Sequence, residues 1–231
     1  MLNKNYIALS ALVMNSCVVY SWVDIETLHK LTNVDRNEIQ RVMNRLDSIE
    51  NEAESSWKHY YHVFPNLIRK FNLKKGCEIG VSTGGHSHKI LETTHVEKLY
   101  SIDPYTPNTT LNLWVEGNYY YDIMFLRVKH RLGQYGDRSE MIRAYSSDVA
   151  DRFKDNELDF VFVDGSHEYQ YVKEDLELYY KKIRSGGIMA GDDYNTGFPG
   201  VARAVNEFFA AQGLKVTIDA EQPRIWWIQK P

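Results

Sequence analysis

The sequence predicts an α/β fold, in which a seven-stranded, mainly parallel sheet carries helices on both faces and follows an N-terminal helical appendage. Three observations lead to this class. From Lys75 onward, short apolar runs alternate with amphipathic helical stretches. Glycine-containing or acidic loops follow several of these runs, as expected at the ligand-binding edge of such a sheet. The 231 residues, 43% hydrophobic and 25% charged, can form one large soluble domain with a small addition. We place the appendage at residues 1–55 and the main domain at 56–231.

The first apolar stretch, Ile7 to Val19, is too short to cross a bilayer, and no clear signal-peptidase site follows it. We therefore predict a buried helix there and expect no membrane partner. The two cysteines, Cys17 and Cys77, have no metal-type spacing, so neither a zinc site nor a disulfide framework is indicated. A reducing, cytoplasmic compartment is the simpler expectation.

Two short helices follow, joined at residues 32–34. Ile25, Leu28 and Leu31 share one face of the first, and residues 35–38 resemble a capping box that opens the second. The pair resembles a helix-turn-helix, which leaves two interpretations: contact with DNA, or packing and homodimer formation through these helices. We favour the second, because acidic residues offset the arginines of the second helix. The formal net charge of -4 likewise gives no reason to expect a nucleic-acid partner.

The main domain opens with an aromatic-rich helical stretch from Trp57 to Phe71. The expected strands are Cys77–Gly80, Leu99–Ile102, Met141–Ala144, Phe160–Val163, Gly187–Ala190, Lys215–Ile218 and Ile225–Ile228. A helix runs from Tyr169 to Ile183, and residues 184–187 stop it. A short connection makes the last two strands antiparallel neighbours. On the helix after the first strand, we expect His86 and His88 to be surface residues.

Carboxylates and a histidine follow two of the expected strands. Asp164 comes directly after the fourth strand with His167 three positions on, and Asp192 and Asp193 follow the fifth. Carboxylate oxygens suit hard divalent cations, and a nearby neutral imidazole can take a proton from a hydroxyl. Alternatively, the aspartates cap the following segment and His167 is an ordinary turn residue. The joint occurrence of these residues favours a reaction centre.

The loop after the first strand, Glu78 to Gly85, indicates the kind of ligand. It lacks both the G-x-G-x-x-G order of dinucleotide enzymes and the lysine of a P-loop. An acidic residue precedes the first glycine, which suits a cationic amino group better than a pyrophosphate. Asp103, after the second strand, stands where a carboxylate can accept both ribose hydroxyls. An aminoacyl nucleoside meets both demands.

From about Phe64 to the C-terminus, these motifs resemble the class I S-adenosylmethionine-dependent methyltransferases with their Rossmann-like fold. Within that family they are most similar to metal-dependent sugar O-methyltransferases of the macrocin and mycinamicin type. The resemblance implies transfer of a methyl group from S-adenosylmethionine to a sugar hydroxyl of a small molecule or glycan, assisted by Mg2+ or another divalent cation. It assigns the methionine part of the cofactor to Glu78, Gly80, Ser82 and Gly84, the ribose to Asp103, and the adenine to Ser147 or Asp148. It assigns the metal to Asp164, Asp192 and Asp193, and the general base to His167, with Asp164 also part of the catalytic centre.

Aromatic residues between the second and third strands suggest a substrate lid, because aromatic rings stack on sugar rings or flat phenols. We expect Trp114 and Tyr119 to contact the acceptor, together with Tyr194 beside the aspartate pair. Core packing or an oligomer contact is the alternative for the lid. Two other functions stay open: methylation of a phenol or catechol, and a non-catalytic, ligand-sensing DNA-binding protein.

Overall fold

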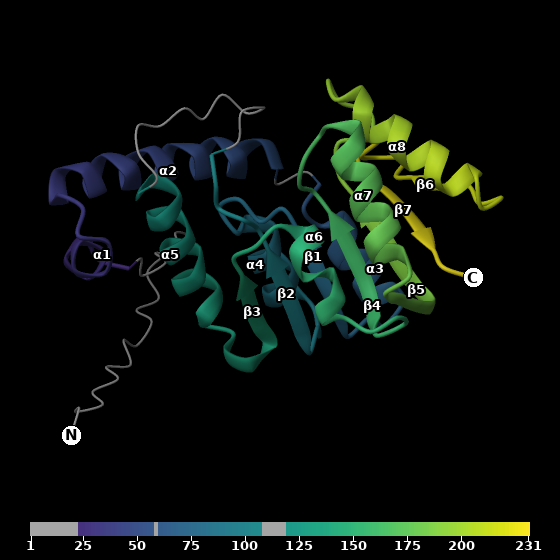
Figure 1. Ribbon diagram of the computed structural model, residues 1–231, viewed down its shortest axis with the longest axis horizontal. Coiled ribbons are helices and arrows are strands. Elements are labelled where there is room, and N and C mark those ends of the chain that lie inside the picture. The colour runs from purple at the N-terminus through teal and green to yellow at the C-terminus, as the bar shows by residue number, and fades with distance from the viewer. Residues whose placement is uncertain (1–22, 58–59, 108–118) are drawn as a thin grey trace.

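The computed structural model describes residues 23–57, 60–107 and 119–231, and its centre is one seven-stranded sheet (Figure 1). The strand order is β3-β2-β1-β4-β5-β7-β6. The strands are β1 (Lys75–Ile79), β2 (Lys98–Ile102), β3 (Ser139–Ile142), β4 (Leu158–Val163), β5 (Ile183–Gly191), β6 (Thr217–Ile218) and β7 (Trp226–Gln229). Strands β1 to β5 are parallel, whereas β7 is antiparallel to β5 and to β6. The predicted fold class and the antiparallel final pair are confirmed.

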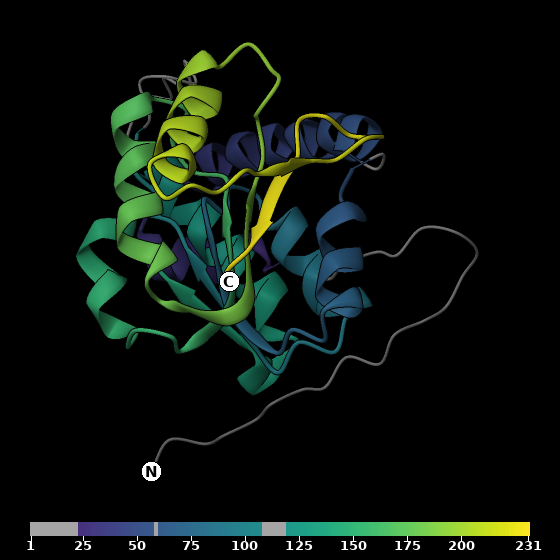
Figure 2. The ribbon, with the colours of Figure 1, turned by 90° about the vertical axis from the view of Figure 1, so that its right-hand side faces the viewer.

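Helices cover both faces of the sheet (Figure 2). One layer contains α3 (Val63–Lys70), α4 (Gly85–Thr93) and α5 (Tyr119–Gly133); the other contains α6 (Ser146–Val149), α7 (Tyr169–Tyr180) and α8 (Pro199–Ala210). Two short 3-10 turns, Gly136–Arg138 and Ala150–Arg152, connect elements of the domain. Alternation along β4 explains the two cores, because Phe160 and Phe162 face the first layer while Val161 and Val163 face the second.

The N-terminal helices α1 (Ile25–Thr32) and α2 (Arg36–Trp57) pack beside α5 and share its hydrophobic core (Figure 1). Leu28 is fully buried as expected, but Leu31 is 63% exposed, so the predicted face of α1 is wrong at that position. The helix ends at Thr32, and Leu31 in its last turn points away from the core. The expected helix from Ile7 to Val19, with Cys17, lies outside the described residues.

The region around residues 184–187 differs from its prediction. Helix α7 ends at Tyr180, and Ile183, which was expected on the helix, begins β5. The register between β4 and β5 shifts here, and a Cβ on Gly187 would lie 2.5 Å from the Asp159 carbonyl oxygen. The glycines therefore serve an irregular strand that approaches its neighbour closely, and they do not stop a helix.

Among the helices of the described ranges, none combines the length and apolar character that crossing a membrane requires.

Candidate functional site

The two motifs from the sequence meet where the strand order reverses, between β1 and β4. Such a switch point is the usual ligand site of an open α/β sheet. Gly80 follows β1 with a φ of 85°, and a Cβ there would lie 2.1 Å from the backbone oxygen of Asp164. The Asp164 amide donates to the Ile79 carbonyl oxygen at 2.8 Å. The glycine loop and the first predicted metal ligand are therefore in direct contact.

The second aspartate pair joins them from β5. Gly191 pairs with Val163 in the sheet, which brings the strand ends side by side, and the Asp192 amide donates to the Val163 carbonyl oxygen. Burial raises the pKa of Asp164 well above its usual range, and the charges of Asp192 and Asp193 raise it further. Burial also raises the pKa of Asp192. The three carboxylates therefore lie close enough for their charges to interact, at the strand edge where the sequence places them.

A guanidinium that the sequence analysis did not identify lies between two of these carboxylates. Nε of Arg224 lies 2.5 Å from Oδ1 of Asp192, and Nη2 lies 2.7 Å from Oδ1 of Asp193. Arg224 comes from the connection between β6 and β7, and its guanidinium stacks 4.2 Å from the ring centre of Tyr60. Across the described parts of the chain, no group of three or more His, Cys, Asp or Glu residues is arranged to hold a metal ion. In this conformation the cation beside the aspartates is Arg224.

His167 is fixed on two sides. Its Nε2 lies 2.7 Å from Oδ2 of Asp193, and its ring stacks on Phe198 with 3.9 Å between ring centres and 11° between planes. Its Nδ1 is buried and has no hydrogen-bond partner among the residues that the structure describes. A small pocket at this place is lined by the ends of β4 and β5 and by α7, α8 and β7: Val163, Asp164, Gly165, Ser166, His167, Val172, Asp192, Asp193, Val201 and Trp226. Of the two ring nitrogens, Nε2 is therefore the one paired with a carboxylate, and Nδ1 makes no hydrogen bond within the described residues.

The acidic residue Asp103 braces the loop that follows β1. Its Oδ2 accepts hydrogen bonds from the amides of Val81 and Ser82 at 2.9 and 3.0 Å, and its Oδ1 accepts one from the Tyr105 amide at 2.8 Å. The Tyr105 hydroxyl donates to the Ser82 carbonyl oxygen at 3.0 Å. Burial still raises the pKa of Asp103. Asp103 thus connects the ends of β1 and β2.

Glu78 is almost fully buried, and helix α4 supplies partners for its carboxylate. Oε1 lies 2.7 Å from Nδ1 of His86, and the Ser87 hydroxyl donates to Oε2. The expectation that His86 and His88 are surface residues is wrong, since they are only 6% and 5% exposed. His86 packs against the ring of Phe162, and burial lowers the pKa of His88 to about 4. His86 and Ser87 point inward because the buried Glu78 carboxylate needs donors, whereas Nδ1 of His88 lies 2.7 Å from the Tyr135 hydroxyl.

The remaining predicted residues lie at different places. Ser147 and Asp148 are exposed in α6, after β3. Tyr119 begins α5, and its hydroxyl donates to Glu38 of α2 at 3.3 Å. The Tyr194 amide donates to the Arg224 carbonyl oxygen, beside the aspartate pair, and its hydroxyl donates to Asn206. Trp114 lies outside the described residues.

Comparisons with known proteins identify the family and the fold of this chain. Residues 73–194 match a family model described as a methyltransferase domain. An uncharacterized protein of Acanthamoeba polyphaga mimivirus is 30% identical over 170 residues, which cover 70% of this chain and 72% of that protein. A candidate caffeoyl-CoA O-methyltransferase from Staphylococcus aureus has a TM-score of 0.60 at 16% identity, with 90% of this chain and 97% of that one covered. An O-methyltransferase from Bacillus cereus, solved in complex with SAH, has a TM-score of 0.53 at 15% identity, with 89% and 96% covered. At these identities the two solved structures share the fold.

Proposed function

This chain belongs to the class I S-adenosylmethionine-dependent methyltransferase family, and we propose that it transfers the methyl group to a sugar hydroxyl of a glycan or glycoside with the help of a divalent cation. One observation carries the proposal: His167 and three carboxylates converge at the ends of β4 and β5, in contact with the loop after β1. That loop is the proposed cofactor site.

The acceptor chemistry explains why a base is needed. Methyl transfer from a sulfonium to oxygen is an in-line displacement, so the acceptor must be aligned with the methyl group. An aliphatic hydroxyl is a weak acid and needs a group that takes its proton as the new bond forms. We assign the ring proton of neutral His167 to Nε2, where Asp193 can accept it, which leaves the lone pair on Nδ1, the nitrogen without a partner among the described residues. His167 therefore accepts the proton at Nδ1, and Asp193 stabilises the resulting imidazolium.

The carboxylates suit a hard divalent cation by residue type, although in this conformation they are not arranged around a metal site and Arg224 pairs with two of them. Asp164, Asp192 and Asp193 would hold it through oxygen ligands. One guanidinium faces Asp192 and Asp193, and no hydrogen bond or ion pair to the Asp164 side chain is seen among the described residues. Burial and the neighbouring carboxylates raise the pKa of Asp164, and a bound cation would reverse that effect by favouring its ionised form. Bound there, a cation would lower the pKa of the acceptor hydroxyl and stabilise its alkoxide. Because Arg224 holds two of the three carboxylates, we expect it to compete with the cation.

The proposed cofactor contacts follow the strand edge. The methionine part would lie by Glu78, Gly80, Ser82 and Gly84, the ribose at Asp103, and the adenine near Ser147 or Asp148. Each carboxylate oxygen has two acceptor sites, so Glu78 can keep its partners on α4 and still face an ammonium group. The location of these residues after β1, β2 and β3, which are adjacent strands, supports the assignment.

A methyl-transfer assay with labelled S-adenosylmethionine tests the proposal. Glycosides with vicinal hydroxyls and catechols are offered separately and in competition, with EDTA and then with excess Mg2+. We expect methylation of the glycosides, its loss in EDTA and its return with Mg2+. Methylation of catechols alone would favour the phenol alternative, and full activity in EDTA would remove the cation from the proposal. Duplex DNA binding without any methyl transfer would instead favour a ligand-sensing DNA-binding protein.

A further inference from the structure

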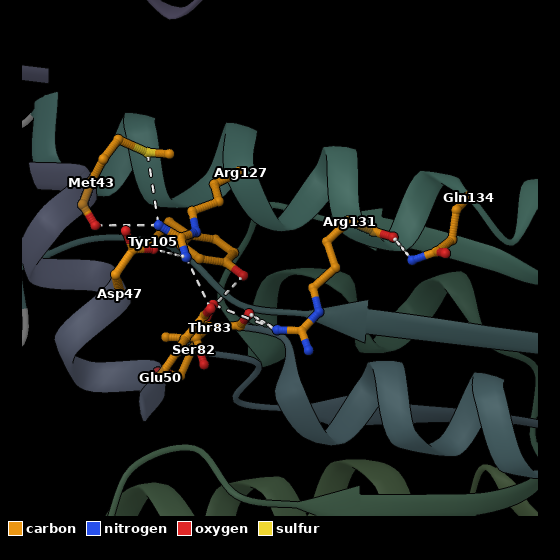
Figure 3. Close-up of polar contacts among 9 residues, drawn as sticks. All are labelled: Met43, Asp47, Glu50, Ser82, Thr83, Tyr105, Arg127, Arg131 and Gln134. Carbon is orange, nitrogen blue, oxygen red and sulfur yellow. Dashed lines mark hydrogen bonds and ion pairs between the residues drawn. The ribbon is translucent and has the colours of Figure 1, made fainter. Parts of the chain in front are cut away.

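A buried charge cluster connects the N-terminal helix α2 to the main domain (Figure 3). Arg127 of α5 has a side chain that is only 1% exposed. Its Nη2 lies 2.6 Å from Oδ1 of Asp47 and 2.9 Å from Oε2 of Glu50, and its Nη1 donates to the Met43 carbonyl oxygen at 3.3 Å. A buried guanidinium is costly without opposite charge, so α5 depends on these α2 carboxylates.

Glu50 extends the cluster to the loop after β1. Its Oε1 lies 3.5 Å from Nη1 of Arg131, one helical turn beyond Arg127. The same nitrogen lies 3.5 Å from the Thr83 carbonyl oxygen (Figure 3). The Glu50 and Arg131 side chains are 15% and 7% exposed, so little water screens their charges. One carboxylate thus stands between two buried guanidiniums, and the second of these reaches the loop backbone.

The loop itself is packed tightly on α5. Gly84 has a φ of 77°, and a Cβ there would lie 2.7 Å from Cγ1 of Val128. Val128 stands between Arg127 and Arg131 in sequence, so a shift of α5 moves both the apolar and the polar support of the loop. The loop at Gly84 is therefore in close contact with this face of α5.

We propose that Glu50 is a positioning residue for cofactor binding: its carboxylate holds Arg131 against the Thr83 carbonyl oxygen and so keeps residues 81–84 in the conformation that receives S-adenosylmethionine. The inference rests on the proposed location of the cofactor at this loop. Without the negative charge of Glu50, Arg127 and Arg131 repel each other, and the loop loses a fixed donor. Helix α2 then supports the cofactor loop through α5 and is not only an appendage.

Three variants separate charge from packing. Glu50→Gln keeps the shape of the side chain and removes its charge, Glu50→Asp keeps the charge and shortens the chain, and Asp47→Asn alters a carboxylate that contacts Arg127. Calorimetry should give a Kd for S-adenosylhomocysteine that rises about fivefold or more in Glu50→Gln and about twofold or less in the other two. In steady-state assays of Glu50→Gln, the KM for S-adenosylmethionine should rise together with this Kd, while kcat and the KM for the acceptor stay within about twofold of the wild-type values. Melting temperatures show that each variant is folded.

Several outcomes would overturn the inference. A larger loss in Glu50→Asp than in Glu50→Gln would mean that packing matters and charge does not. An equal loss of affinity in Asp47→Asn would make the effect a general one of the α2–α5 contact.

The variant Asp103→Asn distinguishes this inference from the cofactor assignment. If Asp103→Asn weakens S-adenosylhomocysteine binding and Glu50→Gln does not, only the role of Glu50 is wrong. If neither variant weakens binding, the loop is not the cofactor site, and the cofactor assignment and the role of Glu50 are both wrong. Should Glu50→Gln fail to fold, Arg131→Lys, which keeps the charge, should raise the same Kd, and an unchanged Kd would refute the inference.

Discussion

Nε2 of His167 lies 2.7 Å from Oδ2 of Asp193, so a carboxylate orients the imidazole. The stacked ring of Phe198 restricts rotation of the imidazole as well. A base held in this way by a third group is a recurring arrangement for activating oxygen nucleophiles. The pair is formed across the ends of β4 and β5, which are adjacent in the sheet.

The first prediction concerns His167, the proposed base. We expect His167→Ala to lower kcat about 100- to 1,000-fold with a sugar acceptor, because the hydroxyl proton then has no acceptor. The Kd for S-adenosylhomocysteine should stay the same, since the ion pair and the ring contact of His167 go to Asp193 and Phe198 and not to the proposed cofactor residues. Single-turnover kinetics and calorimetry on the same samples check both values. An unchanged kcat would remove His167 from the chemistry.

The second prediction concerns Arg224, which ion-pairs with Asp192 and Asp193. Removing its charge in Arg224→Gln should tighten Mn2+ binding about tenfold, because the cation no longer displaces a guanidinium. Binding can be followed by electron paramagnetic resonance of free Mn2+ without any turnover.

Arg203→Gln provides a matched control for that measurement. Arg203 also stacks on a tyrosine at 4.2 Å and pairs with a carboxylate, Glu207 at 2.9 Å, but it lies on the surface of α8. The variant Arg203→Gln should therefore leave the Mn2+ affinity unchanged. Equal Mn2+ affinity in the wild type and in Arg224→Gln would contradict the proposed competition between Arg224 and the cation, whichever acceptor the enzyme methylates.

The strand ends were predictable from the sequence because their signal is local. Asp164 directly follows a short apolar run, and parallel strands bring such positions to one edge of the sheet. Arg224 had no comparable signal. It reaches the aspartates from a connection about 30 positions away, and a single arginine in a turn carries no periodicity.

The buried polar residues were harder still. His86 lies in a stretch that is polar by composition, and only the carboxylate of Glu78 at the end of the neighbouring strand explains why its ring turns inward. Glu50 and Arg127 have the usual composition of an exposed helix face, and the tertiary packing of α2 on α5 decides their burial. Periodicity describes one element at a time, so pairs between elements escape it.

The third prediction tests the close approach of the loop to β4. Gly80→Ala should lower the free energy of unfolding by about 3–5 kcal/mol and abolish S-adenosylhomocysteine binding, because the new Cβ meets backbone atoms of Asp164 and Gly165 that cannot move aside. Gly133→Ala is the control, since a Cβ there meets nothing within 4 Å. Its free energy of unfolding should change by no more than about 1 kcal/mol. Urea denaturation measures both free energies of unfolding. Equal denaturation curves for Gly80→Ala and Gly133→Ala would refute the close approach of Gly80 to the backbone of Asp164 and Gly165.

The fourth prediction concerns Asp175 of α7, which is 4% exposed and accepts a hydrogen bond from the Ser146 hydroxyl at 2.5 Å. Burial raises the pKa of Asp175 to about 7, from 3.8. The folded protein therefore binds this proton more tightly than the unfolded chain does. Its contribution to the free energy of unfolding falls as pH rises from about 4 to about 7 and is constant above that.

Asp175→Asn should remove this dependence, because the amide carries no charge at any of these pH values. The free energy of unfolding of the variant minus that of the wild type should increase by a few kcal/mol, about 2–4, between pH 4.5 and pH 8. Urea denaturation at four pH values in this range gives the difference directly. His88, whose pKa is lowered to about 4, makes both proteins less stable below about pH 6.5, and this common effect cancels in the difference. If the free energies of unfolding of the two proteins change with pH in parallel, Asp175 is ionised in the folded state and another group balances its charge.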